Sequence, residues 1–267
     1  MNADPTPIPD LDLRPGAAED ASALAELFIG ARRAAEPAMP ASVHAPAEIH
    51  HWFAGLGLGQ PDKKRETWVA EQSGVVVGYV VLDPEWLDSL YVRHDLTGQG
   101  IGSVLLDLAK SLRPEGFGLW VFESNEPARR FYTARGLLAL ERTDGGENEE
   151  QAPDIAMVWP GTDPVAHLRR KIDAVDTDLG KVLARRAALT AVIQGFKPVA
   201  GHQGRDLARE TDIANRLAEH APGLGPERIE RILHVVISES LDAAAGRDDN
   251  LELSEGAARI GRSGHVG

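Results

Sequence analysis

The chain has 267 residues and a mass of 28.7 kDa, with 43% apolar and 26% charged residues, so it is long and apolar enough to fold as two domains. The net charge of −13 disfavours nucleic acid and anionic membranes as partners, and the lack of cysteine excludes disulfides, thiolate metal sites and cysteine nucleophiles. The first twelve residues have no basic segment leading into an apolar run, and no stretch approaches ~18 apolar residues, so we expect a cytoplasmic protein with no membrane contact.

The charge and the hydrophobic pattern both change near residue 160. Residues 1–160 hold 13 Lys and Arg against 25 Asp and Glu, a net charge of −12, whereas residues 161–267 hold 15 against 16, a net charge of −1. Strand-like runs alternate with helical stretches before this point and are absent after it. We therefore predict a first domain over 1–160, a linker over 161–164, a helical domain over 165–246 and a disordered tail over 247–267.

In the first domain the pattern predicts a mixture of helices and strands. A strand over 10–14 is followed by helices over 19–34 and 48–56, a hairpin with strands 68–71 and 75–82, and a strand over 87–92. Next come a helix over 101–112, a strand over 118–122, a helix over 127–135 and strands over 137–141 and 155–159. The acidic, glycine-rich segment 144–153 is predicted to be a mobile loop.

A glycine-rich turn joins the strand over 87–92 to the following helix. The pattern Gly98-x-Gly100-x-Gly102 places free backbone N–H groups at the positive end of a helix, an arrangement that suits a pyrophosphate. The same glycines also occur where a helix packs tightly against a strand. A Rossmann dinucleotide site is disfavoured, because the pattern comes late in its domain and lacks the third glycine spacing.

The order of elements and three motifs resemble the GNAT superfamily of acetyl-coenzyme A dependent N-acetyltransferases over residues 8–160. The motifs are Leu90-Tyr91-Val92, Gly98-Gln99-Gly100-Ile101-Gly102 and Asn125-Glu126-Pro127-Ala128-Arg129-Arg130-Phe131-Tyr132, followed by Gly136-Leu137. The resemblance implies an α+β fold, a mixed sheet with flanking helices, whose fourth strand splays from the fifth. It also implies that acetyl-CoA is the co-substrate, with its pantetheine arm in the gap between those strands.

The same resemblance implies a set of residues around acetyl-CoA, namely Tyr91, Val92, Gly98, Gln99, Gly100, Ile101, Gly102 and Asn125. Tyr132 is either a packing aromatic or the acid that protonates the leaving thiolate, since a phenol of pKa ~10 roughly matches a thiol of ~8.5. The base stays open among Glu85, Asp88 and Glu123. The family commonly has Arg or Gln at Thr97, so we expect weakened cofactor binding.

Three histidines and the overall acidity of the first domain bear on metal binding and on the acceptor. Helical spacing puts His50 and His51 on different faces, so we interpret them and His44 as surface residues and predict no metal site. The acidity favours a cationic or amine acceptor, whose identity the sequence does not give.

In the second half, apolar residues recur at steps of three and four from Pro164 to Lys197 and predict one helix about 50 Å long. They are Val165, Leu168, Ile172, Val175, Leu179, Val182, Leu189, Ile193 and Phe196. A monomer of ~100 residues does not cover such a rod, so we expect a homodimer. The same register places Arg186 in the apolar seam, where a guanidinium needs an anion, either a structural carboxylate or a ligand.

More cations accompany Arg186. A second helix is predicted to open at Asp206-Leu207-Ala208-Arg209-Glu210 and a third to run from about Pro226 to Ala245, with Ser240 on its inward side. Three arginines (Arg169, Arg186 and Arg209) and Lys197 would then converge on an apolar bundle. This set suggests a small ligand with two carboxylates, because a guanidinium binds a carboxylate through two parallel hydrogen bonds.

These residues, as spaced, resemble the all-helical, AroQ-class chorismate mutases over about residues 165–245. The motifs are Leu168-Arg169-x-x-Ile172-Asp173-x-x-Asp176-x-x-Leu179, Leu183-Ala184-Arg185-Arg186, Lys197, Asp206-x-x-Arg209-Glu210 and Ile237-Ser238-Glu239-Ser240-Leu241. The resemblance implies an all-α, three-helix domain that forms an intertwined dimer. Its activity would be the rearrangement of chorismate to prephenate in aromatic amino acid biosynthesis, which belongs to the shikimate pathway.

The resemblance also implies the roles of the residues. Arg186 and Arg169 of the partner subunit would hold carboxylates, with Arg209 and Ser240 nearby. Lys197 would donate to the ether oxygen, and Glu210 with the backbone at Asp206 would take the ring hydroxyl. A pericyclic rearrangement needs no metal, nucleophile or proton transfer, so positioning and a fixed cation beside the growing charge are enough.

Two departures keep alternatives open. Ala244 stands where the family usually offers Gln or Glu to the ether oxygen, and Pro198 directly follows Lys197. Low activity, dependence on a partner enzyme, and an isochorismate pyruvate-lyase activity are all compatible with these residues. So is a helical domain that only dimerises or senses an aromatic metabolite. For the first domain, the alternative is acetyl-CoA binding without transfer.

Overall fold

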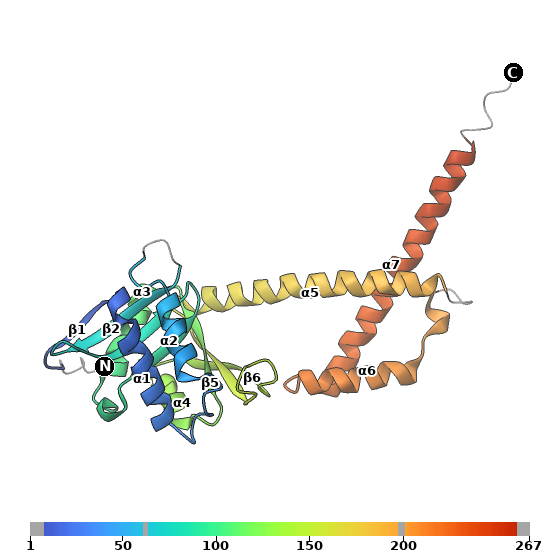
Figure 1. Ribbon diagram of the computed structural model, residues 1–267. Coiled ribbons are helices and arrows are strands. Elements are labelled where there is room, and N and C mark those ends of the chain that lie inside the picture. Colours follow the sequence, from blue (N-terminus) through green and yellow to red (C-terminus); the bar gives the residue numbers. More distant parts are fainter. Residues whose placement is uncertain (1–7, 61–63, 197–200, 261–267) are drawn as a thin grey trace. The chain divides into compact units, whose positions relative to one another are not determined.

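The computed structural model describes residues 8–60, 64–196 and 201–260 (Figure 1). Contacts divide the chain into two compact units, Met1–Arg170 and Lys171–Gly267. The division lies inside a long helix, a few residues beyond the predicted linker, because the start of that helix packs on the first unit. There His167 is buried, and its Nδ1 lies 2.6 Å from the carbonyl oxygen of Glu115.

The first unit contains each strand and helix that the sequence pattern predicted, with bounds shifted by a few residues. In chain order its elements are β1 (Leu11–Pro15), a 3-10 turn (Ala18–Asp20), α1 (Ala21–Ala34), α2 (Pro46–Gly55), β2 (Glu66–Gln72), β3 (Val75–Leu82), β4 (Leu87–Val92), a second 3-10 turn (His94–Leu96), α3 (Ile101–Leu112), β5 (Phe117–Phe122), α4 (Glu126–Ala134), β6 (Leu138–Thr143) and β7 (Asp154–Trp159).

The strands form two antiparallel sheets, ordered β1-β2-β3-β4 and β5-β7-β6. The sheets meet where β4 and β5 begin: Trp86 and Gly118 form a parallel bridge, and the Gly118 N–H donates to the Glu85 carbonyl oxygen at 2.9 Å. Glycine is required at this point because a Cβ on Gly118 would come within 2.9 Å of the Trp86 ring. Among the described strands, β4 and β5 have no further ladder pairs, so they diverge from this bridge.

Helices cover both faces of the first sheet, and β3 is buried between these two helix layers. Val80 and Leu82 belong to a core cluster with α3 and β5, whereas Tyr79 and Val81 belong to a cluster with α1 and α2. Alternate residues of a strand point to opposite faces, so this division of β3 shows that helices pack on both faces of the first sheet. The first unit therefore closes its apolar core within one chain.

The second unit is helical. Its elements are α5 (Pro164–Gln194), which begins in the first unit, a 3-10 turn (Gly201–Gly204), α6 (Leu207–His220) and α7 (Pro226–Ile260). Helices α6 and α7 pack through a small cluster formed by Ala214, Ile229, Leu233, Ile237 and Leu241. The third helix, predicted to end near Ala245, continues as α7 to Ile260, because the Leu, Glu and Ala residues that favour a helix outweigh the two glycines there.

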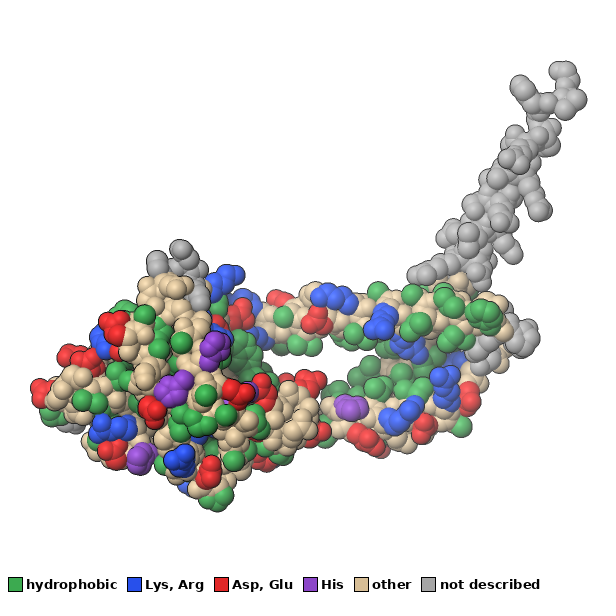
Figure 2. Space-filling model, in the orientation of Figure 1, with side chains coloured by type: hydrophobic (Ala, Val, Ile, Leu, Met, Phe, Trp, Pro, Cys, Tyr) green, Lys and Arg blue, Asp and Glu red, His purple; other side chains and the backbone are tan. Residues whose placement is uncertain are grey.

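Much of the apolar stripe on α5 is exposed within one chain (Figure 2). Val175 is 66% exposed, Val182 63% and Leu189 58%. The stripe predicted from the sequence is therefore present on the helix, but the chain's own α6 and α7 cover little of it. In the part of the chain that the structure describes, no helix is both long and apolar enough to cross a membrane.

Candidate functional site

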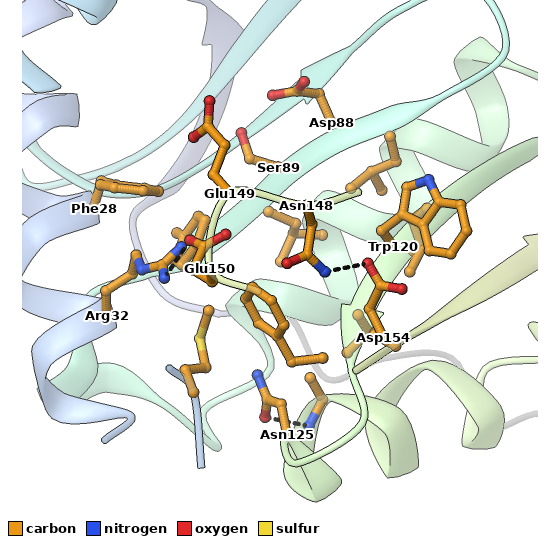
Figure 3. Close-up of a pocket in the computed structure, with 18 of the residues that line it drawn as sticks. Phe28, Arg32, Asp88, Ser89, Trp120, Asn125, Asn148, Glu149, Glu150 and Asp154 are labelled. Atoms are coloured by element: carbon orange, nitrogen blue, oxygen red, sulfur yellow. Dashed lines mark hydrogen bonds and ion pairs between the residues drawn. The ribbon is translucent and has the colours of Figure 1, made fainter. Parts of the chain in front are cut away.

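A cavity of about 920 Å³ lies where β4 and β5 part in the first unit (Figure 3). Its walls come from α1, α2, β4, β5, α4 and the segment between β6 and β7. Three of the residues singled out from the sequence, Tyr91, Asn125 and Tyr132, line it together. The splayed pair of strands expected from the GNAT resemblance is thus present, and the predicted tyrosines and asparagine meet beside it.

The side chains of these three residues are held by the fold. Asn125 caps α4, because its Oδ1 accepts from the Ala128 N–H at 3.2 Å. Tyr91 packs edge-on against Phe28, and burial raises its pKa. Burial also raises the pKa of Tyr132. A raised pKa keeps the Tyr132 phenol protonated. It also makes the difference between the pKa of this phenol and that of a thiol larger than the small difference expected from the sequence.

The glycine-rich turn lies at the start of α3, outside this cavity's lining. Gly98 and Gly100 have φ values of +81° and +93°, which favour glycine. Gly102 sits against the Phe131 ring, where an added Cβ would lie 3.5 Å from the ring edge. The first N–H groups of a helix have no carbonyl one turn earlier, so the start of α3 offers free donors to an anion. Of the other predicted cofactor residues, Ile101 is buried, Val92 packs partly buried against the same core, and Gln99 is exposed.

Of the three candidate bases, only Asp88 lines the cavity. Burial raises its pKa, although Arg65 Nη2 lies 3.3 Å from its Oδ1. Glu123 instead pairs with Arg142, and Glu85 accepts the Gly118 N–H through its backbone at the strand bridge. The sequence did not rank the three candidate bases, whereas the structure places only Asp88 among them in the lining of the cavity.

The segment between β6 and β7, predicted to be a mobile loop, forms one wall of the cavity through specific contacts. Glu150 accepts from Arg32 Nη2 of α1 at 2.8 Å, and Glu149 lies 2.6 Å from His44 Nε2. Asn148 Nδ2 donates to Asp154 Oδ2 at 2.9 Å. The hydrogen bond to Glu149 raises the pKa of His44. Figure 3 shows Glu149 and Glu150 directed toward the cavity from this segment.

Two of the histidines interpreted as surface residues, His44 and His50, pair with acids. Besides His44, His50 Nε2 lies 3.0 Å from Glu26 Oε1. Over the described residues, the structure contains no group of three His, Asp or Glu side chains suited to a metal ion.

In the second unit, Arg186 and Ser240 lie together. Arg186 Nη1 donates to Ser240 Oγ at 2.8 Å and to the Val236 carbonyl at 3.2 Å, and Ser240 Oγ donates to the same carbonyl at 2.6 Å. Burial lowers the pKa of Arg186. No carboxylate of the described residues forms an ion pair with Arg186, so the structural pair that the sequence left open is not seen there.

Glu210 has a partner that the sequence reasoning missed. Arg205 Nε donates to its Oε1 at 2.8 Å, Arg205 Nη2 pairs with its Oε2, and Arg205 Nη1 also donates to Ser238 Oγ on α7 at 3.1 Å. These hydrogen bonds lower the pKa of Glu210. Arg205 directly precedes the Asp206 motif, so its position beside a predicted site residue was the signal available in the sequence.

Asp206 and Arg209, two further predicted residues of the second unit, lie at the start of α6. Asp206 caps α6 by accepting the Arg209 N–H at 3.0 Å, and the Arg209 side chain is exposed. Arg169 is exposed on α5 within the first compact unit. Lys197 lies outside the described residues.

Comparison with known proteins gives matches in both units. Residues 26–137 match the model of the acetyltransferase (GNAT) family, and residues 168–244 match that of type II chorismate mutase. The chain is 32% identical over 94 residues to the peptidyl-lysine N-acetyltransferase YjaB of Salmonella typhimurium, covering 35% of this chain and 64% of that protein. It is 33% identical over 97 residues to an uncharacterized N-acetyltransferase of Archaeoglobus fulgidus, covering 31% of this chain and 65% of that protein. The chain thus spans just under two thirds of these relatives.

Solved structures similar to the chain include apo YjaB from Escherichia coli, at 24% identity and a TM-score of 0.47 over 57% of this chain and 99% of that one. Another is the PaiA N-acetyltransferase of Thermoplasma acidophilum in complex with coenzyme A, at 19% identity and a TM-score of 0.45 over 56% of this chain and 98% of that one.

Proposed function

On the premise that the chain joins a GNAT-family acetyltransferase domain to a type II chorismate mutase domain, we propose that it is a bifunctional enzyme. The first domain would transfer an acetyl group from acetyl-CoA to an amine, and the second would convert chorismate to prephenate. Acetyl-CoA and chorismate are small molecules, and we expect the protein to act in the cytoplasm.

The observation that carries the acetyltransferase proposal is the cavity at the divergence of β4 and β5, lined by Tyr91, Asn125 and Tyr132. The residues fit acetyl-CoA as co-substrate: the strands leave a gap for a narrow chain, and the start of α3 offers N–H groups and the helix dipole to a pyrophosphate. Thr97 is uncharged and adds no attraction for the pyrophosphate there, and its hydroxyl donates to the His94 carbonyl at 2.9 Å.

Asp88 and Tyr132 would move the two protons of the reaction. Asp88 takes a proton from the attacking ammonium, directly or through water, so that the nitrogen lone pair can form the new N–C bond at the thioester carbonyl. The C–S bond then breaks as Tyr132 donates a proton to the thiolate, and the second proton lost from the new amide nitrogen returns through water to Tyr132. The raised pKa of Asp88 makes its carboxylate a stronger base than an ordinary one.

Release of free thiol from acetyl-CoA across a panel of amines tests this function. Tyr132→Phe should lower kcat by about 10²-fold by loss of general acid catalysis. Thr133→Ser, at the exposed neighbouring position, is the control and should leave kcat unchanged. Absence of acetyl transfer to every amine, with acetyl-CoA still bound, would support binding without transfer.

For the helical domain, the observation that carries the proposal is Arg186, a half-buried guanidinium without a carboxylate among its described partners, beside Ser240. Such a group suits one carboxylate of chorismate. Glu210, kept ionised by Arg205, would accept the ring hydroxyl with the backbone at Asp206. Lys197, Arg209 and Arg169 of the partner subunit complete the proposed set. These groups act by holding the substrate and by opposing charge as the ether bond breaks, so no proton transfer is needed.

Ala244 gives the alternative a specific basis. It is 4% exposed on α7 and offers no hydrogen bond, so one expected donor to the ether oxygen is absent. A sensing module, or an isochorismate pyruvate-lyase activity, would tolerate this better. Chorismate turnover measured on the wild type and on Ala244→Gln separates these possibilities. Turnover in the wild type that rises about tenfold in the variant supports the mutase, since one added donor is worth up to ~10²-fold.

We further propose that a second copy of the chain covers α5. The exposed stripe that includes Val175, Val182 and Leu189 is too apolar to remain in water. Light scattering after size exclusion should give a dimer of the wild type, and Val182→Glu should give a monomer. Val75→Glu, at an exposed valine of β3 in the first unit, is the matched control.

A further inference from the structure

Arg32 is a cation inside the acetyltransferase cavity that uses only part of its hydrogen-bonding capacity. It is 9% exposed, and its Nη2 donates to the Pro40 carbonyl at 3.0 Å and to Glu150 Oε1 at 2.8 Å. Its Nε is buried with no hydrogen-bond partner in the described structure. The guanidinium also lies over the rings of Phe28 and Phe122, at 5.6 and 5.8 Å from their centroids.

The pairing with Glu150 leaves this guanidinium incompletely satisfied. A guanidinium binds a carboxylate best through two parallel N–H donors, and a buried N–H without an acceptor is unfavourable. Glu150 contacts only Nη2, and it comes from the segment between β6 and β7 rather than from an element packed beside α1. In Figure 3 the Glu150 carboxylate meets Arg32 at the edge of the cavity. It occupies the position that the carboxylate of a bound molecule would take.

The rest of the cavity has the opposite charge. Besides Glu150, its lining includes Glu48, Asp88, Glu147 and Glu149, with Arg32 as the only Arg or Lys among the lining residues. Trp52 and Trp120 also line it and are 42% and 48% exposed, so their rings leave surface open to a cation, although one face of Trp120 stacks on Trp86. One buried guanidinium within an acidic, aromatic cavity fits a molecule that carries one carboxylate and one ammonium group.

We propose that the amine acceptor carries a carboxylate, and that this carboxylate binds Arg32 in exchange for Glu150. The proposal rests on the acetyltransferase function of the first domain. The exchange replaces one anion by another, so Arg32 is never left as an unpaired buried charge. The incoming carboxylate can also engage Nε, which Glu150 does not. The ammonium group is then attracted by the acids of the walls, among them the proposed base Asp88.

Matched substrates test this class directly. The panel contains free L-amino acids, their carboxamides, the corresponding decarboxylated amines and lysine inside a peptide. The measured quantity is the ratio of kcat/KM for each free acid to that of its carboxamide. We expect the best substrate to be a free acid with a ratio of about 10 or more, as one charge-assisted hydrogen bond gives. An amino acid series of increasing chain length between the two groups measures the distance from Arg32 to the reacting centre.

Three variants assign the effect to Arg32. Arg32→Gln should bring the ratio close to 1. Glu150→Gln removes the competing carboxylate and should lower KM for the free acid about threefold or more relative to KM for the carboxamide, so the acid-to-carboxamide ratio rises. Arg33→Gln, at the exposed neighbouring position on α1, is the control and should keep the wild-type ratio. If Arg32→Gln does not fold, the Glu150→Gln result decides alone, because it leaves Arg32 in place.

Carboxamides, decarboxylated amines or peptide lysine turned over as well as the free acids would overturn the proposal. So would an unchanged ratio in Arg32→Gln. Quenching of indole fluorescence from Trp52 and Trp120 by the same panel separates this proposal from the acetyltransferase function. If no amine is acetylated but free acids bind more tightly than carboxamides, and Arg32→Gln removes the difference, the transfer function fails and the carboxylate site stands. Equal binding of acids and carboxamides overturns the site.

Discussion

The two compact units differ in whether one chain is enough to bury the apolar surface. In the first unit, helices on both faces of a sheet leave Phe53, Tyr79 and Leu105 with 0% exposure, and the candidate cavity is lined by that unit alone. In the second, one small cluster joins α6 and α7, while Val182 of α5 is 63% exposed. The first site is therefore built within one chain, and we expect the second to be completed by another copy.

The largest expected effect separates the two sites. Arg186→Ala removes the half-buried guanidinium beside Ser240 and should lower kcat/KM for chorismate by about 10³-fold, the loss expected for one partner of a buried charged pair. Acetyl transfer should not change, because Arg186 has no part in the first unit. Parallel assays on one preparation measure both. A loss below about fivefold would remove Arg186 from the proposed mutase site.

The next prediction concerns core stability. Leu105→Ala, at a fully buried position of α3, should lower the free energy of unfolding of the first unit by about 2–5 kcal/mol. Val182→Ala, on the exposed stripe, should cost less than ~0.5 kcal/mol in a monomeric variant. Urea unfolding followed by tryptophan fluorescence measures the first unit, since all five tryptophans lie before residue 160, and the far-ultraviolet circular dichroism signal of helix follows the second unit. Equal losses of stability from the two substitutions would contradict the difference in burial between the first unit and the stripe of α5.

A third prediction tests the base. Asp88→Asn should lower kcat/KM for acetyl transfer by about 10²-fold. Burial raises the pKa of Asp88, and the base works only when ionised, so the acid limb of the wild-type pH profile should lie above that of an ordinary carboxyl. The variant should lose this limb. Glu66→Gln, which removes a carboxylate of β2 outside the cavity, serves as the control.

The smallest effect is on acid stability. Hydrogen bonds from Arg14 lower the pKa of Asp20 below 3.8 in the folded state, so this carboxylate stabilises the fold above its unfolded pKa. That contribution is lost as the pH falls through the lowered, folded value. Asp20→Asn should reduce stability at pH 7 by about 1 kcal/mol and flatten its decline below pH ~4. Identical pH dependence in variant and wild type would assign Asp20 no such role.

The sequence predicted the elements well because their patterns are local. The alternation along 75–82 and the helical spacing over 101–112 reflect which faces are buried, and both elements appear with nearly those bounds. The end of α7 was missed, since isolated glycines and charges do not by themselves end a helix. The loop at 144–153 was predicted, but its contacts with Arg32 and His44 were not, because they join residues more than 100 positions apart.

By itself, the sequence determined the order of the elements, the apolar stripe of α5 and the two sets of motifs that carry the family resemblances, because these depend on residues near one another in the chain. Only the tertiary structure decided which carboxylate faces the cavity, that Arg205 holds Glu210, and that a buried Arg32 meets Glu150. Those arrangements follow from how distant segments pack, and no local pattern encodes the distance between two side chains that the fold brings together.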